Sequence, residues 1–313
     1  MRRLRLRAVW TLPLLFVSLL GVSCGCAWRG RSCTGQTTHG TRGCCDPVGV
    51  SSEFCARIGS SGLPVRIQRD CDGAEMVLVP AGEFLMGAAP SDHGAPSEER
   101  PQRRVVLSRA YYLDVHEVTV GQWRAYVRKS GCELGKRVLG RLPASVTDEL
   151  PITYVSYCDA MGFARWAGCD LPSEAQWERA ARAGASGTIW PWGNELEGAG
   201  ERSRFNGAGG RPGYGDQHLG TAPVCSYAAN AFGLCDLIGN VSEWCKDCFE
   251  ADAYERLGAV DPLVSCEHGL RVCRGGDYAS TPYYCRPSFR GKCAEDASWP
   301  FLGFRCVRAT EGQ

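Results

Sequence analysis

The sequence has few of the patterns by which common enzymes are recognised. No Gly-x-Ser-x-Gly elbow joins an expected strand to a helix, and no phosphate-binding loop occurs. Histidine is scarce, and no two of its positions have the i, i+4 spacing of a helical metal site: His39, His93, His116, His218 and His268. No internal repeat is present. These absences exclude Ser/His/Asp hydrolases, P-loop enzymes and enzymes with a helical histidine cluster.

Only one long apolar run occurs, and it lies at the N-terminus. Residues 8–22 are apolar and follow four arginines within the first seven residues, but the run is too short for a membrane span. Its end, Leu20 to Cys24, resembles the motif that precedes the lipid-modified cysteine of bacterial lipoproteins, with Gly21 where Leu is usual. We expect residues 1–23 to be an export signal and Cys24 to carry a lipid. An ordinary secretory signal cleaved elsewhere is the alternative.

The charge balance does not indicate that the protein binds nucleic acid or an anionic surface. Removing residues 1–23 takes away four arginines and leaves 31 basic and 34 acidic residues, a net charge of −3. We therefore expect membrane contact only through the N-terminal lipid. The expected location is extracytoplasmic, as a membrane-anchored lipoprotein or otherwise as a periplasmic or secreted protein.

Cysteine, in contrast, is abundant. The chain has nineteen Cys, more than is usual for an enzyme of the reducing cytosol that lacks the Cys spacing of a metal site. We expect most of them to form disulfides, because disulfides form and persist outside the cytoplasm. Cys245 and Cys248 form a C-x-x-C pair, but no second pair follows at zinc-finger distance and no thioredoxin-like strand and helix surround it. Structural disulfides are therefore favoured over a zinc or redox site.

The composition divides the chain into three parts. After the signal, residues 24–71 are rich in Gly, Ser, Thr and Arg and indicate a tether. The domain is expected over residues 72–309. Short apolar runs predict strands at 76–80, 103–108, 110–115, 241–244, 271–274 and 304–307.

Three helices are predicted from their N-terminal caps. Thr119, Ser156 and Ser173 each precede a Gln or Asp at capping-box spacing, and apolar residues then recur at helical period. Glycines at 168 and 184 are expected to end the second and third helices. The long stretch after residue 185 is interrupted by Gly, so we expect an irregular α+β domain supported by disulfides and bound ions.

Eight motifs in order resemble the formylglycine-generating enzyme (sulfatase-modifying factor) family. They are Met76–Gly87, Glu117-Val118-Thr119, Leu171–Glu178, Trp190–Gly193, Gly220–Val224, Gly233–Trp244, Arg274-Gly275-Gly276 and Gly303-Phe304-Arg305. The resemblance covers residues 75–309. It implies an irregular α+β fold, low in secondary structure and distantly related to C-type lectins.

The resemblance implies two calcium sites. At one, Asp236 and Glu243 would ligate by side chain, with carbonyls from Gly239 and Val241. Without the resemblance, a solvated turn with a cap or salt bridge is the simpler interpretation of the two acids. The second site has the ligand set Asn206 and Asp216 by side chain and Gly207 and His218 by carbonyl.

The copper site of active family members is incomplete in this sequence. The resemblance places two copper(I)-binding Cys after the Gly-Gly pair, and here the positions hold Ser280 and Cys285. A hydroxyl is a poor ligand for copper(I), so copper is not expected. Asp277 replaces a family Ser and Ser242 a family Trp. Cys285 would be catalytic only if the protein were active.

The resemblance also suggests a structural role for Cys285. Family members without the copper pair have Cys at the positions of Cys245 and Cys285, which implies a disulfide between them. Arg286 and Arg290 follow, and they either line a pocket or pair with local carboxylates.

Two functions remain open from the sequence. The first is copper-dependent oxidation of a Cys in an exported sulfatase to formylglycine. The second is a calcium-bound, non-catalytic module that recognises an exported protein or peptide, sulfatase-like, or a glycan. Ser280 favours the second.

Overall fold

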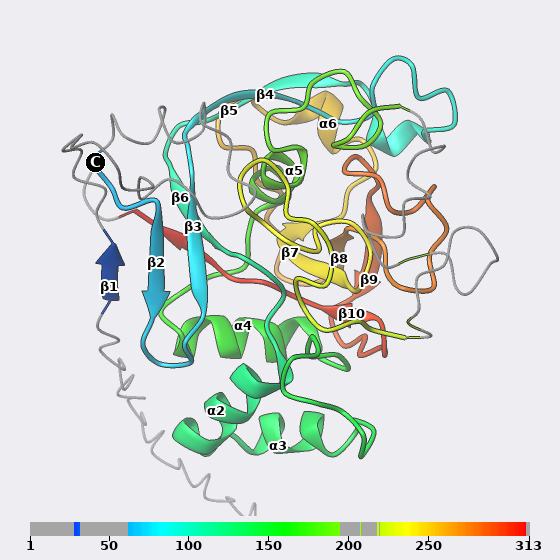
Figure 1. The fold of residues 1–313 in the computed structure, drawn as a ribbon. Coiled ribbons are helices and arrows are strands. Elements are labelled where there is room, and N and C mark those ends of the chain that lie inside the picture. Colours follow the sequence, from blue (N-terminus) through cyan, green and yellow to red (C-terminus); the bar gives the residue numbers. More distant parts are fainter. Residues whose placement is uncertain (1–27, 32–61, 195–206, 208–217, 219, 311–313) are drawn as a thin grey trace, which may run out of the picture.

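The computed structural model describes residues 28–31, 62–194, 207, 218 and 220–310 (Figure 1). Its largest sheet has the order β1-β2-β3-β6-β11, and all neighbouring strands are antiparallel. The strands are β1 (Trp28–Arg31), β2 (Arg66–Arg69), β3 (Glu75–Val79), β6 (Tyr111–Asp114) and β11 (Val307–Ala309). The sheet therefore joins the first part of the domain to its last.

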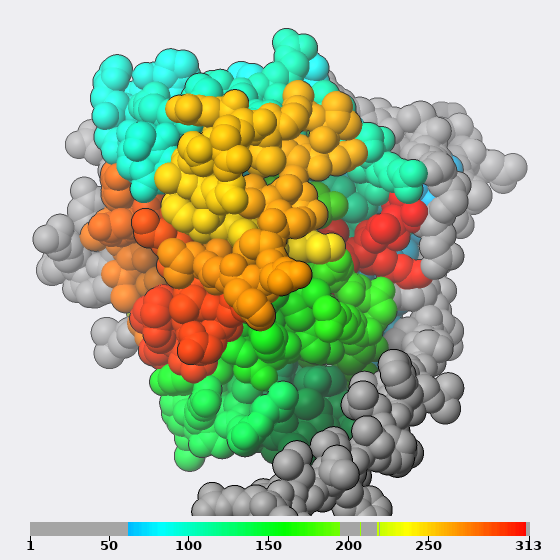
Figure 2. Space-filling model, turned by 180° about the vertical axis from the view of Figure 1, so that it is seen from behind, coloured from blue at the N-terminus to red at the C-terminus, as the bar shows by residue number. Residues whose placement is uncertain are grey.

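A second sheet and a hairpin complete the strands. The sheet has the order β10-β7-β8-β9 and consists of β10 (Leu302–Gly303), β7 (Ser242–Cys248), β8 (Leu270–Arg274) and β9 (Gly291–Ala294). Strands β4 (Gly82–Met86) and β5 (Arg103–Leu107) pair with each other. Seen from behind, the yellow-to-orange segment that follows β7 lies between the cyan first part of the domain and the green helices (Figure 2).

Three of the helices begin with complete capping boxes. Thr119, Ser156 and Ser173 cap α2 (Val120–Ser130), α4 (Tyr157–Trp166) and α5 (Glu174–Arg182), as the sequence predicted. The remaining helices are α3 (Glu133–Leu139), α6 (Ala253–Arg256) and the 3-10 turn η1 (Ser97–Glu99). None of the described helices is long and apolar enough to cross a membrane.

The core consists of two apolar clusters. The first contains Trp177 of α5 together with residues of β3, β5 and β6. In the second, Trp123 of α2 stacks on Phe163 of α4 with ring centroids 5.6 Å apart. Helix α5 also contacts β4, β7 and β8, so it lies at the centre of the fold in Figure 1. The α+β fold class is confirmed, with low helical content.

The folded part begins before Asp72. Strand β2 pairs with β3, although the sequence assigned residues 24–71 to a tether. Arg69 is fully buried, and its guanidinium lies 2.7 Å from Asp72 and 3.1 Å from Asp114. The polar composition of this segment therefore did not reveal that Arg69 is buried in an ion pair with Asp114, 45 residues away.

The predicted strand at 304–307 differs from the structure. Strand β10 ends at Gly303 and β11 begins at Val307 in the other sheet, and the residues that connect them include the fully buried Phe304 and Arg305. Strands β1, β2, β4, β9 and β10 and helices α3 and α6 were not predicted. Disulfides are confirmed in the described residues, as Cys225–Cys235 and Cys248–Cys266.

Candidate functional site

The Gly-Gly turn after β8 supports the position of Cys285. Gly276 has φ +69°, and a Cβ placed on it would lie 2.7 Å from Cys285 Sγ and 2.9 Å from the Tyr284 carbonyl oxygen. Only glycine permits this approach. The turn, Ser280 and Cys285 therefore form one compact unit.

The Cys285 thiol lies in an environment that keeps it protonated. Its side chain is fully buried, and Sγ approaches the Ser280 carbonyl at 4.0 Å. Burial raises the pKa of Cys285, and the charge of Asp277 raises it further. The Asp277 carboxylate accepts a hydrogen bond from the Ala279 amide at 2.9 Å, and the Ser280 side chain also bonds to it. The two positions that would bind copper(I) thus offer a hydroxyl and a thiol, which do not fit that ion.

The disulfide expected between Cys245 and Cys285 is not formed in this structure, and both are buried thiols. Cys245 lies on β7 within the first apolar cluster, where its charged neighbours include Arg274 and Glu174. Cys285 lies instead beside Gly276 and Asp277. The pairing rested on motif positions, which do not reveal that the two side chains have different surroundings.

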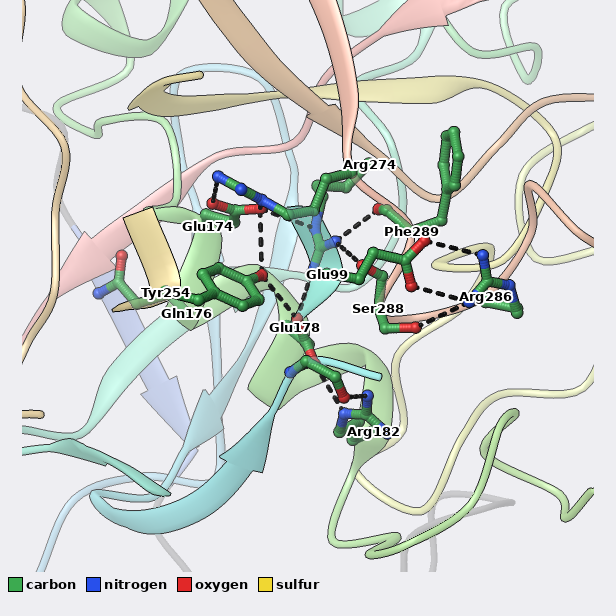
Figure 3. A network of polar contacts seen from close by, with 12 residues as sticks. Glu99, Glu174, Gln176, Glu178, Arg182, Tyr254, Arg274, Arg286, Ser288 and Phe289 are labelled. Atoms are coloured by element: carbon green, nitrogen blue, oxygen red, sulfur yellow. Dashed lines mark hydrogen bonds and ion pairs between the residues drawn. The ribbon is translucent and has the colours of Figure 1, made fainter. Parts of the chain in front are cut away.

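A buried network of acids and arginines holds the segment that carries Cys285 (Figure 3). Arg286 donates to both oxygens of Glu99, at 2.7 and 2.8 Å, and to Asp92 at 2.5 Å. Arg290 donates to both oxygens of Glu174, at 2.7 and 3.0 Å. The sequence left open whether these two arginines line a pocket or pair with carboxylates. The structure shows that they pair with carboxylates.

Glu178 of α5 is the second centre of this network. It accepts hydrogen bonds from Arg274 of β8, from Arg182 at 2.9 Å and from the Gly87 amide at 2.8 Å. Arg274 also donates to the Ser288 and Phe289 carbonyls, at 2.8 and 2.5 Å. Figure 3 shows Glu178 between Arg182 and Arg274. Burial alone would raise the pKa of nearby Glu174, but Arg290 and Arg274 more than offset it and lower that pKa.

The first expected calcium site is a buried acidic cluster. Glu243 is 1% exposed and accepts from Arg305 at 2.7 and 2.8 Å and from Trp177 Nε1 at 2.8 Å. Asp236 has φ +57°, and its Oδ2 accepts from the Cys225 amide at 2.6 Å. Burial raises the pKa of Asp236 to about 6, against the effects of the Cys225 amide and Arg305.

Glu117 also belongs to this cluster, although its position in the sequence did not indicate a chemical role. It is fully buried, two residues before the cap of α2. Burial and, second, the charge of Asp236 raise its pKa well above the usual value. The available signal was a carboxylate next to apolar Val118 within the Glu-Val-Thr motif. No group of three His, Cys, Asp or Glu side chains in the described part of the chain has the arrangement of a ready-made metal site. Calcium also uses backbone carbonyls, and Gly239 and Val241 lie in the same turn as Asp236.

Several expected residues lie outside the described part of the chain. Asn206 and Asp216 of the second calcium set and the lipidation residue Cys24 belong to this group. The remaining members of the second set are described individually, with Gly207 buried and His218 exposed.

Comparison with known proteins identifies the family. Residues 61–310 match the family described as sulfatase-modifying factor enzyme 1-like domain. The chain belongs to this family. The formylglycine-generating enzyme of Streptomyces coelicolor is 34% identical over 278 residues, covering 74% of this chain and 88% of that protein.

Two further relatives show the range of proteins that share the domain. A Chlamydia pneumoniae protein named serine/threonine-protein kinase pkn1 is 32% identical over 75% of this chain, but only 38% of its own length is covered. The structure of PvdO from Pseudomonas aeruginosa superposes with a TM-score of 0.66 at 26% identity, covering 76% of this chain and 95% of that one. The family fold is thus found in proteins with different names.

Proposed function

We propose that this protein is a non-catalytic binding module of the sulfatase-modifying factor family. The proposal rests on Ser280 and Cys285. The resemblance to the family implies copper-binding thiolates at both of these positions. A hydroxyl is a hard ligand and stays protonated near neutral pH, and Cys285 is a buried thiol beside the Asp277 carboxylate. Neither group favours copper(I).

The proposal is tested by copper binding and by turnover. Titration of the purified, reduced protein with copper(I) against a competing chelator is expected to give no tight site. Incubation with copper, oxygen, a thiol reductant and a peptide containing Cys-x-Pro-x-Arg is expected to leave the peptide mass unchanged. Conversion of the peptide cysteine to an aldehyde, abolished by Cys285→Ala, would contradict the proposal. Ser280→Cys is expected to add copper affinity, because it restores two sulfur ligands at this turn.

The second candidate function is formylglycine generation itself. It is favoured by the 34% identity to the Streptomyces coelicolor enzyme over most of both chains. The peptide assay separates the two candidates directly, because only an oxidase changes the mass of the peptide. Isothermal titration with the same peptide measures binding independently of turnover.

We propose calcium as the bound ion of this domain. Asp236 lies at the start of a turn with buried acids around it, and the composition of oxygen ligands suits calcium rather than a transition metal. Calcium at a hundredfold excess over its dissociation constant would stabilise the folded state by about 2.7 kcal/mol. Chelation is therefore expected to lower the melting temperature, and an identical melt with and without chelator would contradict calcium binding.

We propose an extracytoplasmic location and an exported polypeptide as partner. The basic, apolar N-terminal segment and the disulfides Cys225–Cys235 and Cys248–Cys266 support this location. Mass spectrometry of the membrane fraction is expected to find a lipid on Cys24. A soluble product with a free N-terminus beyond Cys24 would contradict the lipid while leaving export intact.

A further inference from the structure

A cavity of about 350 Å³ lies between helix α4 and the segment that follows β7. Figure 2 shows this yellow-to-orange segment next to the green helices on the face seen from behind. The volume lies within the roughly 300–1,000 Å³ that is typical of small-molecule sites. None of the described residues that line the cavity belongs to the acidic cluster or to the segment that carries Cys285. The cavity is therefore separate from the sites described above.

The cavity wall is basic. Its lining includes Arg165, Lys246 and Arg271, and no acidic residue is among the described residues that line it. Positive charges in a partly enclosed space raise the local concentration of anions. The formal net charge of the whole chain is only +1, so this group of cations is a local feature.

Two of these cations have donors available for a ligand. Arg165 is exposed, and its guanidinium makes no hydrogen bond or ion pair within the part of the chain that the structure describes. Lys246 Nζ lies 2.6 Å from Asp170 Oδ2, which uses one of its three donors. The side chains of this pair are 41% and 39% exposed, so the ion pair is weak and an anionic ligand can compete with it.

Arg271 is the fixed cation of the wall. Its Nη2 lies 2.7 Å from Glu295 Oε1 and donates to the Cys266 carbonyl at 3.4 Å, and its guanidinium lies 4.3 Å from the centre of the Tyr157 ring. Cys266 is in turn joined to β7 by its disulfide with Cys248. A wall that is held in this way is formed before a ligand arrives, which lowers the cost of binding.

The rest of the lining offers an apolar surface. Met161 and Arg165 follow Tyr157 at i+4 and i+8, so these side chains lie along one face of α4. Leu263 adds an apolar side chain that is 36% exposed. An inorganic ion alone would leave this surface in contact with water, whereas a ligand with an apolar body would cover it.

We infer that this cavity binds a small organic anion. Arg165 and Lys246 hold the anionic group, and Met161 and Leu263 contact the apolar body of the ligand. The inference goes beyond the proposed function, because it involves neither the copper positions nor the acidic cluster.

The exposed thiol of Cys158 provides a measure of occupancy. Cys158 lies in the first turn of α4 and lines the cavity. A ligand in the cavity is therefore expected to slow the reaction of this thiol with iodoacetamide, which is a neutral reagent. The reaction is followed at Cys158 of the full-length protein by peptide mass spectrometry, which separates it from the other cysteines.

Three probes are compared at constant ionic strength. Benzoate has a charge and a ring, benzamide has the ring alone, and sulfate has the charge alone. Benzoate is expected to protect Cys158 at a concentration at least about tenfold lower than either of the others. Equal protection by benzamide would contradict recognition of charge, and equal protection by sulfate would contradict an apolar body. No protection by benzoate would overturn the inference.

Two variants that break the same ion pair distinguish recognition from structure. Lys246→Gln removes a cation from the cavity, whereas Asp170→Asn removes the carboxylate that competes for it. Lys246→Gln is expected to raise the benzoate concentration for half-protection about tenfold, and Asp170→Asn to lower it about threefold. Lys136→Gln is the control, because it breaks an exposed ion pair with Glu133 outside the cavity, and it is expected to change nothing.

The sign of the two effects decides the outcome. Changes in the same direction in Lys246→Gln and Asp170→Asn would show that only the ion pair matters, and would overturn the inference. If Lys246→Gln does not fold, Arg165→Gln is measured in its place with the same expectation. Unchanged protection in that variant would overturn the inference as well.

Discussion

Sγ of Cys273 on β8 lies 2.7 Å from Sγ of Cys293 on β9. This distance is shorter than the contact of two separate thiols, and both side chains are buried in the second apolar cluster. The two strands are antiparallel neighbours, with Cys273 opposite Gly291 and Cys293 opposite Arg271. The geometry brings together two cysteines that motif positions did not connect.

We predict that Cys273 and Cys293 form a disulfide when the protein is kept under oxidising conditions. Disulfides persist in oxidising compartments, and this pair needs little movement to form one. Peptide mapping without reduction is expected to find the Cys273–Cys293 cross-link and to find Cys245 and Cys285 as thiols. A cross-link between Cys245 and Cys285 would restore the pairing expected from the family resemblance.

Glu178→Gln is expected to destabilise the domain by about 3–5 kcal/mol, because it leaves the buried Arg182 and Arg274 without their common partner. The measurement is chemical denaturation followed by tryptophan fluorescence. Glu83→Gln is the control. Its ion pair with Arg104 has side chains 58% and 70% exposed, so its loss is expected to change stability by at most about 1 kcal/mol. Equal effects of the two variants would contradict the central role of Glu178.

Gly276→Ala is expected to cost about 2 kcal/mol or more, because the new methyl group would meet Cys285 Sγ and the Tyr284 carbonyl in a left-handed conformation. Gly187→Ala is a matched control. Gly187 has φ +71° but no atom within 4 Å of an added Cβ, so only backbone strain of about 1 kcal/mol is expected. Denaturation midpoints of the two variants measure the difference, and a cost at Gly276 no greater than at Gly187 would contradict the close packing of Cys285.

The free energy of unfolding is expected to depend on Asp247 between pH 8 and pH 6. Burial, together with the charge of Glu174, raises the pKa of Asp247 to about 7, whereas its unfolded value is near 3.9. The folded state therefore binds the proton more tightly. The contribution of Asp247 to the free energy of unfolding is therefore largest at acidic pH. It is lost as the pH rises through about 7, where the folded state releases the proton. Its size over this range is about 1 kcal/mol.

The measurement compares wild type with Asp247→Asn by denaturation in chelator at pH 6, 7 and 8. The wild-type stability minus that of the variant is expected to be greatest at pH 6. A difference that does not change with pH would show that Asp247 does not titrate in this range.

The sequence predicted those parts of the fold that depend on neighbouring residues. A capping box is completed within four residues, so Thr119, Ser156 and Ser173 could be identified as helix starts without knowledge of the rest. Strand β2 could not be identified in this way. Its Arg69 is buried between Asp72 and Asp114, and Asp114 lies 45 residues away.

In the candidate site, too, the sequence predicted what depends on nearby residues and did not predict contacts between distant ones. The positions of Ser280 and Cys285 came from motif order, which is local. The partners of Arg286 and Arg290 lie 187 and 116 residues away, at Glu99 and Glu174, and no local pattern specifies them. Glu117 was quoted within a motif, but its closeness to Asp236 is a property of the tertiary structure alone.

The position of Arg305 and β11 has a consequence for the timing of folding. Strand β11 pairs with β6, and Arg305 supplies the positive charge beside Glu243 while donating to the carbonyls of Asp114, Val115 and Cys235. A nascent chain in which residue 305 is still inside the ribosome lacks both the last strand of the sheet and the arginine that pairs with the buried Glu243. The domain therefore cannot reach its native state before residues 305–309 have left the ribosome.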